Sequence, residues 1–478
     1  MIRASTILAV AIFLFAFLAY SPTSVAQVNG VSGGTFVFLS SANSCPGSGT
    51  SCYLDNGTLA SSVVSQLRGA GGDFFLLPSA SPTQMNTMAT AINAQGGHFL
   101  TFEEWEWKGA FVNGQFDCDT YTSNRIIPVL LPLKAAFPSA FYGFQFMDEP
   151  IESDHQSLGE LKACLMRQTA FAGMKVFLNL PPLDAAETAL TSPDPSLHTF
   201  RAPADYGVDC TTNTVVDRSL AASMVDQYTT YVLSALDQIQ PDVLAFDQYP
   251  FTPKFDQCSA ARDLVMSENM SIISSQSLRR GVTPVAYLQN VMASPLAAPS
   301  IDSFEYANFH KLRWYSSWFF VFGGQGLANF VSHDEDDGGA KYGMLTADNQ
   351  PRNLLGDQQS NYGMTGQVQR ALAYYPFRQF VAPFLGVSTG SIVGWMPSTD
   401  LLAGEYGDTT ASQVMLYVAR RPQSSTVTTT LGLNQWWVKI EKLNFDTGLW
   451  ETVGQSTNAI DVNLDSFPGA LYRLSSSP

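Results

Sequence analysis

The sequence is poor in basic residues and in the side chains that bind transition metals. Its 478 residues include 25 lysines and arginines against 41 aspartates and glutamates, which gives a net charge of −16. This surplus of negative charge argues against nucleic acid or an anionic membrane surface as a partner. Only five histidines occur, none at paired spacing, and there is no CxxC pair or His/Cys cluster. We therefore predict a protein with no metal and no cofactor.

Long apolar runs are confined to the start of the chain. Arg3 precedes an apolar segment at residues 7–18, and residues 24–26 form a small-residue cleavage site. This pattern predicts a secretory signal peptide at residues 1–26, with an uncleaved membrane anchor as the alternative. No later stretch is long and apolar enough to span a bilayer. We expect a secreted protein, extracellular or periplasmic, and a monomer.

Short apolar runs alternate with amphipathic segments over the next 350 residues or so. Eight runs are typical of parallel strands covered on both faces: residues 35–39, 73–77, 98–102, 142–147, 175–180, 243–246, 282–288 and 326–330. Helical patterns lie between them: residues 82–94, 156–172, 219–239, 259–278 and 304–320. This alternation predicts an α/β fold, a (β/α)₈ TIM barrel at residues 30–382. A doubly wound open sheet is the alternative, but no GxGxxG follows the first strand.

The pattern changes near the C-terminus, and the cysteines suit an oxidising compartment. Period-two alternation predicts an antiparallel β-sandwich at residues 383–478, with these strands: residues 391–395, 414–419, 426–431, 437–444 and 470–474. The chain has six cysteines: Cys45, Cys52, Cys118, Cys164, Cys210 and Cys258. The first two bracket a turn that a disulfide can close, and the last two fall in loops on one face of the predicted barrel. The middle two have no predicted pairing, because Cys164 lies in a helical pattern.

Polar side chains gather where the predicted barrel strands end, which is the face that carries chemistry in this fold. The strongest signal is Asp148-Glu149-Pro150, two adjacent carboxylates at the end of an apolar strand. Carboxylates in such a place are costly unless paired, solvated or used. The other strand ends contribute Glu103, Glu104, Trp105, Asn179, Asp247, Tyr249 and Gln289. Carboxylates that act on a glycosidic bond and aromatic faces that stack on sugar rings are typical of a carbohydrate site.

Each of these residues also has a structural interpretation. Asp148 can cap the following helix, and Asp247 can pair with an arginine in the barrel wall. The glutamates after strand three can be solvated, and Trp105 can belong to the core. The acidic run at residues 333–337 fits a solvated loop or a calcium site.

On these residues the chain resembles the TIM-barrel glycoside hydrolase superfamily. The similar features are Asp148-Glu149-Pro150 after strand four, Asp247-Gln248-Tyr249-Pro250 after strand six, and the C-terminal β-sandwich. The resemblance implies a glycosidase that acts on an oligo- or polysaccharide. In the large retaining clan, strand four ends in Asn-Glu and strand seven carries a nucleophilic glutamate. Here Asp148 stands in the asparagine position, and strand seven has no carboxylate.

Three chemistries are compatible with this departure. In the first, Glu149 is the general acid and Asp247 is the nucleophile or base. In the second, Glu149 is the acid and Asp148 orients a substrate 2-acetamido group that attacks. In the third, Glu103 or Glu104 supplies the second carboxylate. We expect Asn179, Tyr249 and Gln289 to bind substrate hydroxyls or developing charge.

Two further alternatives stay open. The chain can be a non-catalytic carbohydrate-binding protein on a degenerate hydrolase barrel. It can also be a metal-dependent hydrolase that uses Asp148, Asp247 and His333, which the lack of paired histidines disfavours.

Overall fold

The computed structural model describes most of the chain after residue 33. The described residues are 34–39, 52–78, 80–194, 197, 199–293, 305–334, 341–381, 392–396, 400–408, 410–421, 427–464 and 467–477. The predicted signal peptide and Cys45 lie outside these residues. Contacts divide the chain into two compact units, and the division falls between Arg370 and Ala371.

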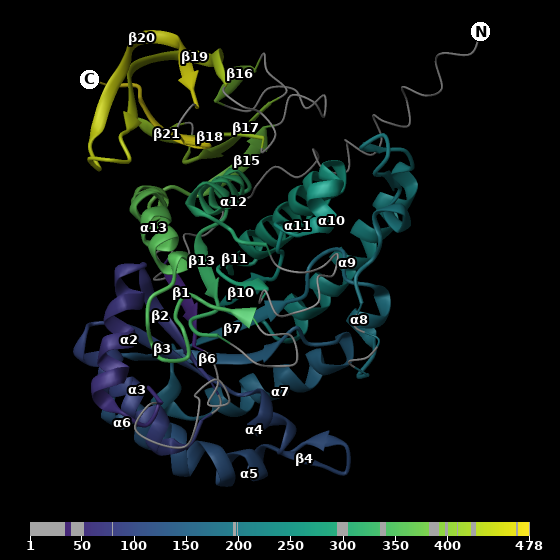
Figure 1. Ribbon diagram of the computed structural model, residues 1–478, viewed down its shortest axis with the longest axis vertical. Coiled ribbons are helices and arrows are strands. Elements are labelled where there is room, and N and C mark those ends of the chain that lie inside the picture. Colours follow the sequence, from purple (N-terminus) through teal and green to yellow (C-terminus); the bar gives the residue numbers. More distant parts are fainter. Residues whose placement is uncertain are drawn as a thin grey trace. The chain divides into compact units, whose positions relative to one another are not determined.

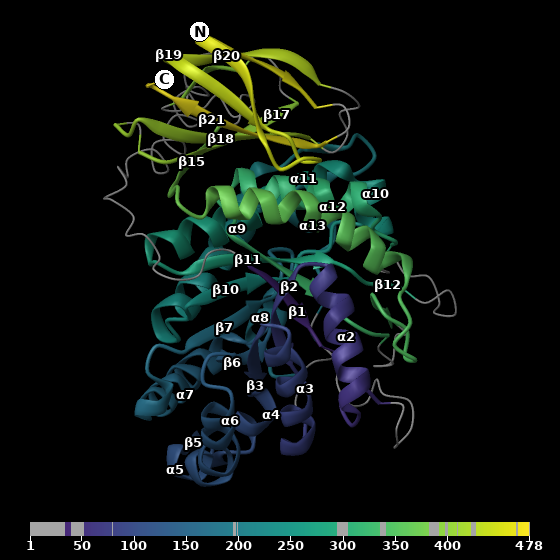
Figure 2. The same ribbon diagram turned by 90° about the vertical axis from the view of Figure 1, so that its left-hand side faces the viewer.

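The first unit is a closed barrel of eight parallel strands (Figure 1 and Figure 2). In chain order the strands are β1 (Thr35–Phe38), β2 (Gly72–Leu77), β3 (His98–Phe102), β6 (Phe141–Asp148), β7 (Lys175–Leu180), β10 (Val243–Phe246), β11 (Thr283–Gln289) and β13 (Gly326–Phe330). Each strand pairs with its sequence neighbours around the barrel, and β13 closes it against β1. All eight predicted strands are confirmed.

Helices lie outside the strands (Figure 1). They are α2 (Gly57–Gly69), α3 (Pro82–Ala94), α4 (Glu104–Lys108), α5 (Cys118–Tyr121), α6 (Leu131–Ala136), α7 (His155–Met166), α8 (Glu187–Thr191), α9 (Arg218–Gln238), α10 (Pro253–Gln257), α11 (Ser259–Arg279), α12 (Phe309–Val321) and α13 (Asn353–Leu372). A π-helical segment, Thr122–Leu130, joins α5 to α6. Short two-stranded ribbons lie in the loops: β4 (Phe111–Val112) with β5 (Gln115–Phe116), β8 (Val208–Asp209) with β9 (Thr214–Val215), and β12 (Met292–Ala293) with β14 (Lys341–Tyr342).

Helix α3 shows why the predicted helices form where they do. Ser81 and Gln84 make a reciprocal capping box, and Pro82 occupies the first helical position. Helix α12 begins at Phe309 rather than at the predicted residue 304, because the Asn308 side chain caps it. Helix α7 ends at Met166, earlier than the predicted residue 172.

The barrel interior is packed with side chains from every second strand position. Its buried cluster contains Phe36, Phe74, Leu76, Leu100, Phe177, Val243, Ala245, Val285, Tyr287 and Ala328. Residues of a strand that point to one face recur every two positions, so Asn179 faces inward like Phe177. The barrel is thus a filled core, and Asn179 lies next to the carboxyl end of its strand.

The second unit is an antiparallel β domain. Its strands are β15 (Phe377–Val381), β16 (Val393–Trp395), β17 (Leu401–Tyr406), β18 (Gln413–Arg420), β19 (Thr428–Leu443), β20 (Trp450–Asn463) and β21 (Gly469–Ser475). They share one apolar core, to which β15 contributes Val381 although it precedes the predicted boundary at residue 383. The predicted antiparallel β-sandwich is confirmed as a fold class. The prediction of two separate strands at residues 426–431 and 437–444 is wrong, because both segments belong to the single strand β19.

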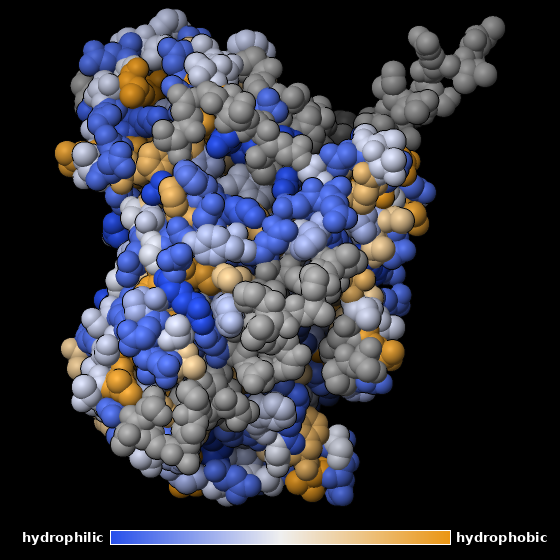
Figure 3. Space-filling view, in the orientation of Figure 1, coloured by the Kyte–Doolittle hydropathy of each residue, from blue (hydrophilic) through white to orange (hydrophobic). Residues whose placement is uncertain are grey.

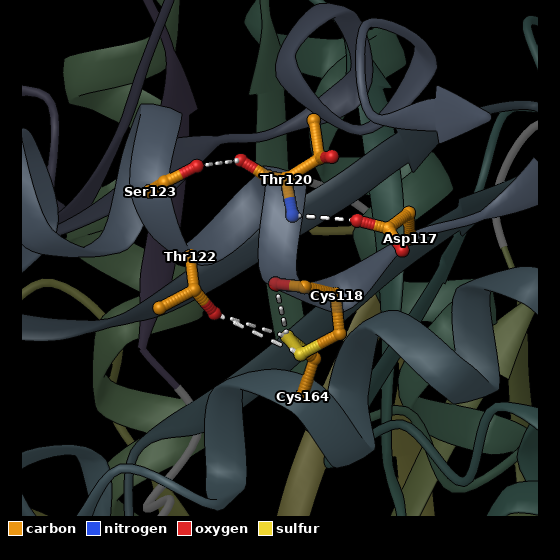
Figure 4. The surroundings of a disulfide bond; sticks show 6 residues. All are labelled: Asp117, Cys118, Thr120, Thr122, Ser123 and Cys164. Atoms are coloured by element: carbon orange, nitrogen blue, oxygen red, sulfur yellow. Dashed lines mark hydrogen bonds between the residues drawn. A yellow bond between two sulfur atoms is a disulfide. The ribbon is translucent and has the colours of Figure 1, made fainter.

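Two disulfides link elements of the barrel unit. Cys210 and Cys258, which the sequence places in loops on one face of the predicted barrel without fixing their connectivity, are joined by a disulfide. Cys118 and Cys164, for which no pairing was predicted, join α5 to α7, with the Thr122 hydroxyl beside both sulfurs (Figure 4). Cys52 is disulfide-bonded, and Cys45, with which it brackets a turn in the sequence, lies outside the described residues.

The coloured surface in Figure 3 is mostly hydrophilic, and apolar residues form small separate patches on that face. Among the described helices, none has the length and apolar character that a membrane crossing requires.

We predict that Gly143→Ala destabilises the barrel by about 3 kcal/mol. A Cβ atom at this position of β6 would lie 2.0 Å from the Lys175 carbonyl oxygen of β7, so the paired strands would have to separate. Urea denaturation measures the loss. Gly57→Ala is the control, because a Cβ there meets nothing within 4 Å. Equal stability of the two variants would contradict the close strand approach.

Candidate active site

The side-chain amide of Asn179 joins two of the predicted catalytic carboxylates. Asn179 is 1% exposed on β7, which lies between β6 and β10. Its Nδ2 donates to Asp148 Oδ1 at 2.7 Å and to Asp247 Oδ2 at 2.9 Å. Because both oxygens contact one nitrogen, they lie less than about 6 Å apart. The ends of strands four, five and six therefore converge on a single pair of carboxylates.

A local irregularity of β6 brings Asp148 into this pair. Gln145 lies opposite Phe177 of β7, yet Asp148 lies opposite Asn179, so three steps on β6 match two on β7. Such a bulge changes the face to which the following side chain points. Without the extra residue, Met147 would lie opposite Asn179. The bulge thus directs Asp148 to the barrel interior.

Tyr249 provides a second donor to Asp247. Its hydroxyl donates to Asp247 Oδ1 at 2.9 Å, so each oxygen of this carboxylate accepts a hydrogen bond from a neutral group. Burial raises the pKa of Tyr249 well above its usual range, and the negative charge of Asp247 raises it further. The phenol therefore stays protonated and remains a donor to Asp247.

Glu149 occupies the turn where β6 ends. Its backbone has φ +49°, a left-handed conformation that is uncommon for a residue other than glycine, and its N–H donates to the Asn179 carbonyl oxygen at 3.1 Å. The Tyr231 hydroxyl donates to the carbonyl of Pro150, the next residue. Burial raises the pKa of Tyr228 in α9, and the Glu149 charge is the next largest cause. The Glu149 carboxylate therefore lies within electrostatic range of α9.

The carboxylates after strand three take part in ion pairs. Glu103 is fully buried, and its two oxygens accept bonds from Arg125 at 2.9 and 3.1 Å. The Tyr121 hydroxyl adds a third bond at 2.7 Å. Glu104 pairs with Lys108 at 2.5 Å. The ring of Trp105, which is 63% exposed, lies under the Lys108 ammonium. These contacts favour the structural interpretation of Glu103.

The side chain of Gln289 also forms hydrogen bonds within the protein. Its Nε2 donates to the carbonyl oxygens of Phe251 and Glu305 at 2.8 and 2.9 Å, and its Oε1 accepts from the Phe251 N–H. The amide therefore fixes the backbone that follows β10 and the segment before α12. Its predicted contact with substrate stays a prediction.

His333, the histidine of the metal-dependent alternative, is buried after β13. Its Nδ1 is bonded to Ser332 Oγ and its Nε2 to Asn349 Oδ1, and its ring stacks on Tyr53. Burial lowers its pKa to about 4. Both ring nitrogens thus have partners other than a metal. No group of three metal-binding side chains occurs among the residues that the structure describes.

A buried ion pair near the end of strand six was not predicted from the sequence. Lys254 Nζ contacts Asp184 Oδ2 at 2.9 Å, and both side chains are under 10% exposed. Gln248, between Asp247 and Tyr249 in the chain, accepts from Asn269 and donates to Asp184. The sequence offers one indication of this ion pair, which is the single lysine among the apolar residues after strand six. This network fixes the segment that carries Asp247.

Comparisons with known proteins return distant structural matches. No model of a known protein family matches the chain, and no curated protein does. A maltogenic α-amylase, AmyB, from Thermotoga neapolitana aligns over 92% of this chain and 98% of its own, with 10% identity and a TM-score of 0.48. A cycloisomaltooligosaccharide glucanotransferase from Paenibacillus sp. aligns over 93% and 85%, with 7% identity and a TM-score of 0.44. Gas2p from Saccharomyces cerevisiae aligns over 70% and 61%, with 10% identity and a TM-score of 0.38. Likenesses this low say nothing about chemistry, which depends on the geometry of the site itself.

We predict that Arg125→Leu lowers the free energy of unfolding by about 3–5 kcal/mol, because it leaves the buried Glu103 charge unpaired. Arg68→Leu, which breaks a partly exposed pair with Asp73, should cost about 1 kcal/mol. Adding Glu103→Gln to Arg125→Leu should restore part of the lost stability. Chemical denaturation measures all three. A small effect of Arg125→Leu would contradict the structural role of Glu103 and would favour a solvated Glu103 that is available for catalysis.

Proposed function

We propose that this protein is a glycoside hydrolase whose catalytic pair is Asp148 and Asp247. The observation that carries the proposal is the shared amide of Asn179, which brings two carboxylates within about 6 Å at the end of the barrel that carries chemistry in this fold. Retaining glycosidases need two carboxyl groups about 5–5.5 Å apart. Inverting enzymes need a wider gap, so the spacing favours retention.

The hydrogen bonds suggest a division of roles. Asp247, with a neutral donor on each oxygen, acts as the ionised nucleophile and attacks the anomeric carbon. Asp148 donates its proton to the leaving oxygen as the glycosidic bond breaks, which gives a covalent glycosyl-enzyme and a free alcohol. Asp148 then takes a proton from water, whose oxygen attacks the anomeric carbon and releases Asp247. Two carboxylates this close repel, so the pair favours holding one proton.

Glu149 is the alternative general acid. It was the acid predicted from the sequence, and it follows Asp148 directly in the chain. Its positive φ turns the backbone away from the strand direction, and its charge acts on the tyrosines of α9. The shared Asn179 amide supports Asp148 as a member of the pair. In the substrate-assisted route, Asp148 would orient a 2-acetamido group instead.

We also propose that the protein is secreted. Two disulfides lie within the described part of the chain, and such bonds persist in oxidising compartments. The carbohydrate substrate would then be met outside the cell.

The roles predict different responses to the leaving group. The wild type and three variants, Asp148→Asn, Asp247→Asn and Glu149→Gln, would be assayed on a panel of 4-nitrophenyl glycosides and on the matching methyl glycosides. Asp247→Asn should lose about 10⁴-fold in kcat on both sets. Asp148→Asn should lose about 10²–10⁴-fold on methyl glycosides and far less on 4-nitrophenyl glycosides, because 4-nitrophenolate leaves without protonation.

The control is Glu152→Gln, which neutralises an exposed carboxylate three residues after Glu149. It should retain wild-type rates. If Glu149→Gln shows the leaving-group dependence instead of Asp148→Asn, Glu149 is the acid. Full activity of both aspartate variants would refute the site. A wild type that binds glycans but cleaves none would favour the carbohydrate-binding alternative.

A further inference from the structure

Tyr287 lies beside the Asp148–Asp247 pair although no role was predicted for it. It belongs to β11, strand seven, and its side chain is part of the barrel core with 1% exposure. Phe246 of β10 lies opposite Ala286 of β11. Asp247 and Tyr287 are the next residues of the two segments, so their backbones are neighbours in the same register. Strand seven therefore supplies a phenol near Asp247, and none of its residues is a carboxylate.

The Tyr287 hydroxyl is buried without a hydrogen-bond partner among the described residues. A buried polar atom in this state costs about 1–3 kcal/mol, and native structures usually supply it with a partner. The Asn179 Oδ1 atom is buried and without a partner in the same way, although its Nδ2 binds both carboxylates. One unsatisfied polar atom thus belongs to Asn179, which contacts Asp247, and the other belongs to Tyr287, which neighbours Asp247 in the strand register.

The two atoms differ in what they offer a ligand. Burial raises the pKa of Tyr287 well above its usual range, and the charges of Asp148 and Asp247 raise it further, so the phenol remains a donor. Asn179 Oδ1 can only accept. A carbonyl satisfies only the donor and an ammonium only the acceptor. Hydroxyl groups satisfy both, because each hydroxyl donates and accepts.

We propose that Tyr287 binds substrate, donating to a free hydroxyl of the sugar ring held at Asp148 and Asp247, while Asn179 Oδ1 accepts from a ring hydroxyl. This inference rests on the proposed function and specifies its substrate class: a sugar with free hydroxyls beside the reacting carbon. A deoxy or acylated ring at that position would leave the buried atoms unpaired and would be rejected.

The test compares Tyr287→Phe with Tyr142→Phe. Tyr142 also has a buried hydroxyl without a partner among the described residues, but it lies at the opposite end of β6. The substrates are the 4-nitrophenyl glycoside that the wild type cleaves fastest and its monodeoxy analogues. Tyr287→Phe should lower kcat/KM about 10- to 100-fold on the parent glycoside. On one monodeoxy analogue it should change kcat/KM less than about twofold, because the bond is already missing. Tyr142→Phe should leave every rate near that of the wild type.

The outcomes separate this inference from the proposed function. If the aspartate variants are inactive but Tyr287→Phe equals the wild type, the partner of the phenol is only water and this inference alone fails. An equal loss on the parent and all analogues indicates a packing role and also overturns it. If the wild type cleaves nothing, calorimetric titration with glucose, galactose, mannose, xylose and N-acetylglucosamine provides the test. Weaker binding by Tyr287→Phe supports the inference, and no binding by the wild type overturns it together with the proposed function.

Discussion

The amide nitrogen of Asn179 is the contact on which the arrangement of the strand-end carboxylates depends. Two like charges near a low-dielectric core repel strongly, and bringing them together requires a donor that reaches both. A primary amide has two N–H groups and no charge, so it can bind one oxygen of each carboxylate. This works only because β7 lies between β6 and β10, an order that the closed barrel imposes.

The barrel could be predicted because parallel strands covered on both faces leave a direct trace in the sequence. Each is a short apolar run, and the helices between them begin at recognisable caps such as Ser81 and Asn308. The β domain left a weaker trace. Residues Asn434, Gln435 and Trp436 are exposed at an irregularity of β19, so the middle of one long strand resembles a turn. Among the described residues, the partner strand β20 pairs only with β19 and is largely exposed, so it lacks the apolar alternation that identifies a strand.

The residues of the candidate site could be predicted from the sequence, but the contacts between them could not. Asp148, Asn179, Asp247 and Tyr249 stand at strand ends, and the order of strands brings them to one face. The bulge in β6 decides whether Asp148 or Met147 lies opposite Asn179, and nothing in the apolar run before it marks the extra residue. The partner of Glu103 was equally hidden, because Arg125 lies in a π-helical segment 22 residues away. Contacts that depend on such local irregularities need coordinates.

The strand-end carboxylates fall into two groups according to the charge of the donors that bind them. Glu103, Asp184 and Asp334 are held by arginine or lysine. A cation beside a carboxylate fixes it in the ionised form and cancels its charge, which suits a structural role. Asn179 and Tyr249 hold Asp148 and Asp247 in another way, because an amide and a phenol position a carboxylate without cancelling its charge. Glycoside cleavage develops positive charge on the sugar ring, and fixed negative charge in a dry site stabilises it without reorganisation. Under the proposed function, the amide and the phenol would therefore orient Asp148 and Asp247 toward the sugar, whereas the cations that bind Glu103, Asp184 and Asp334 stabilise the fold.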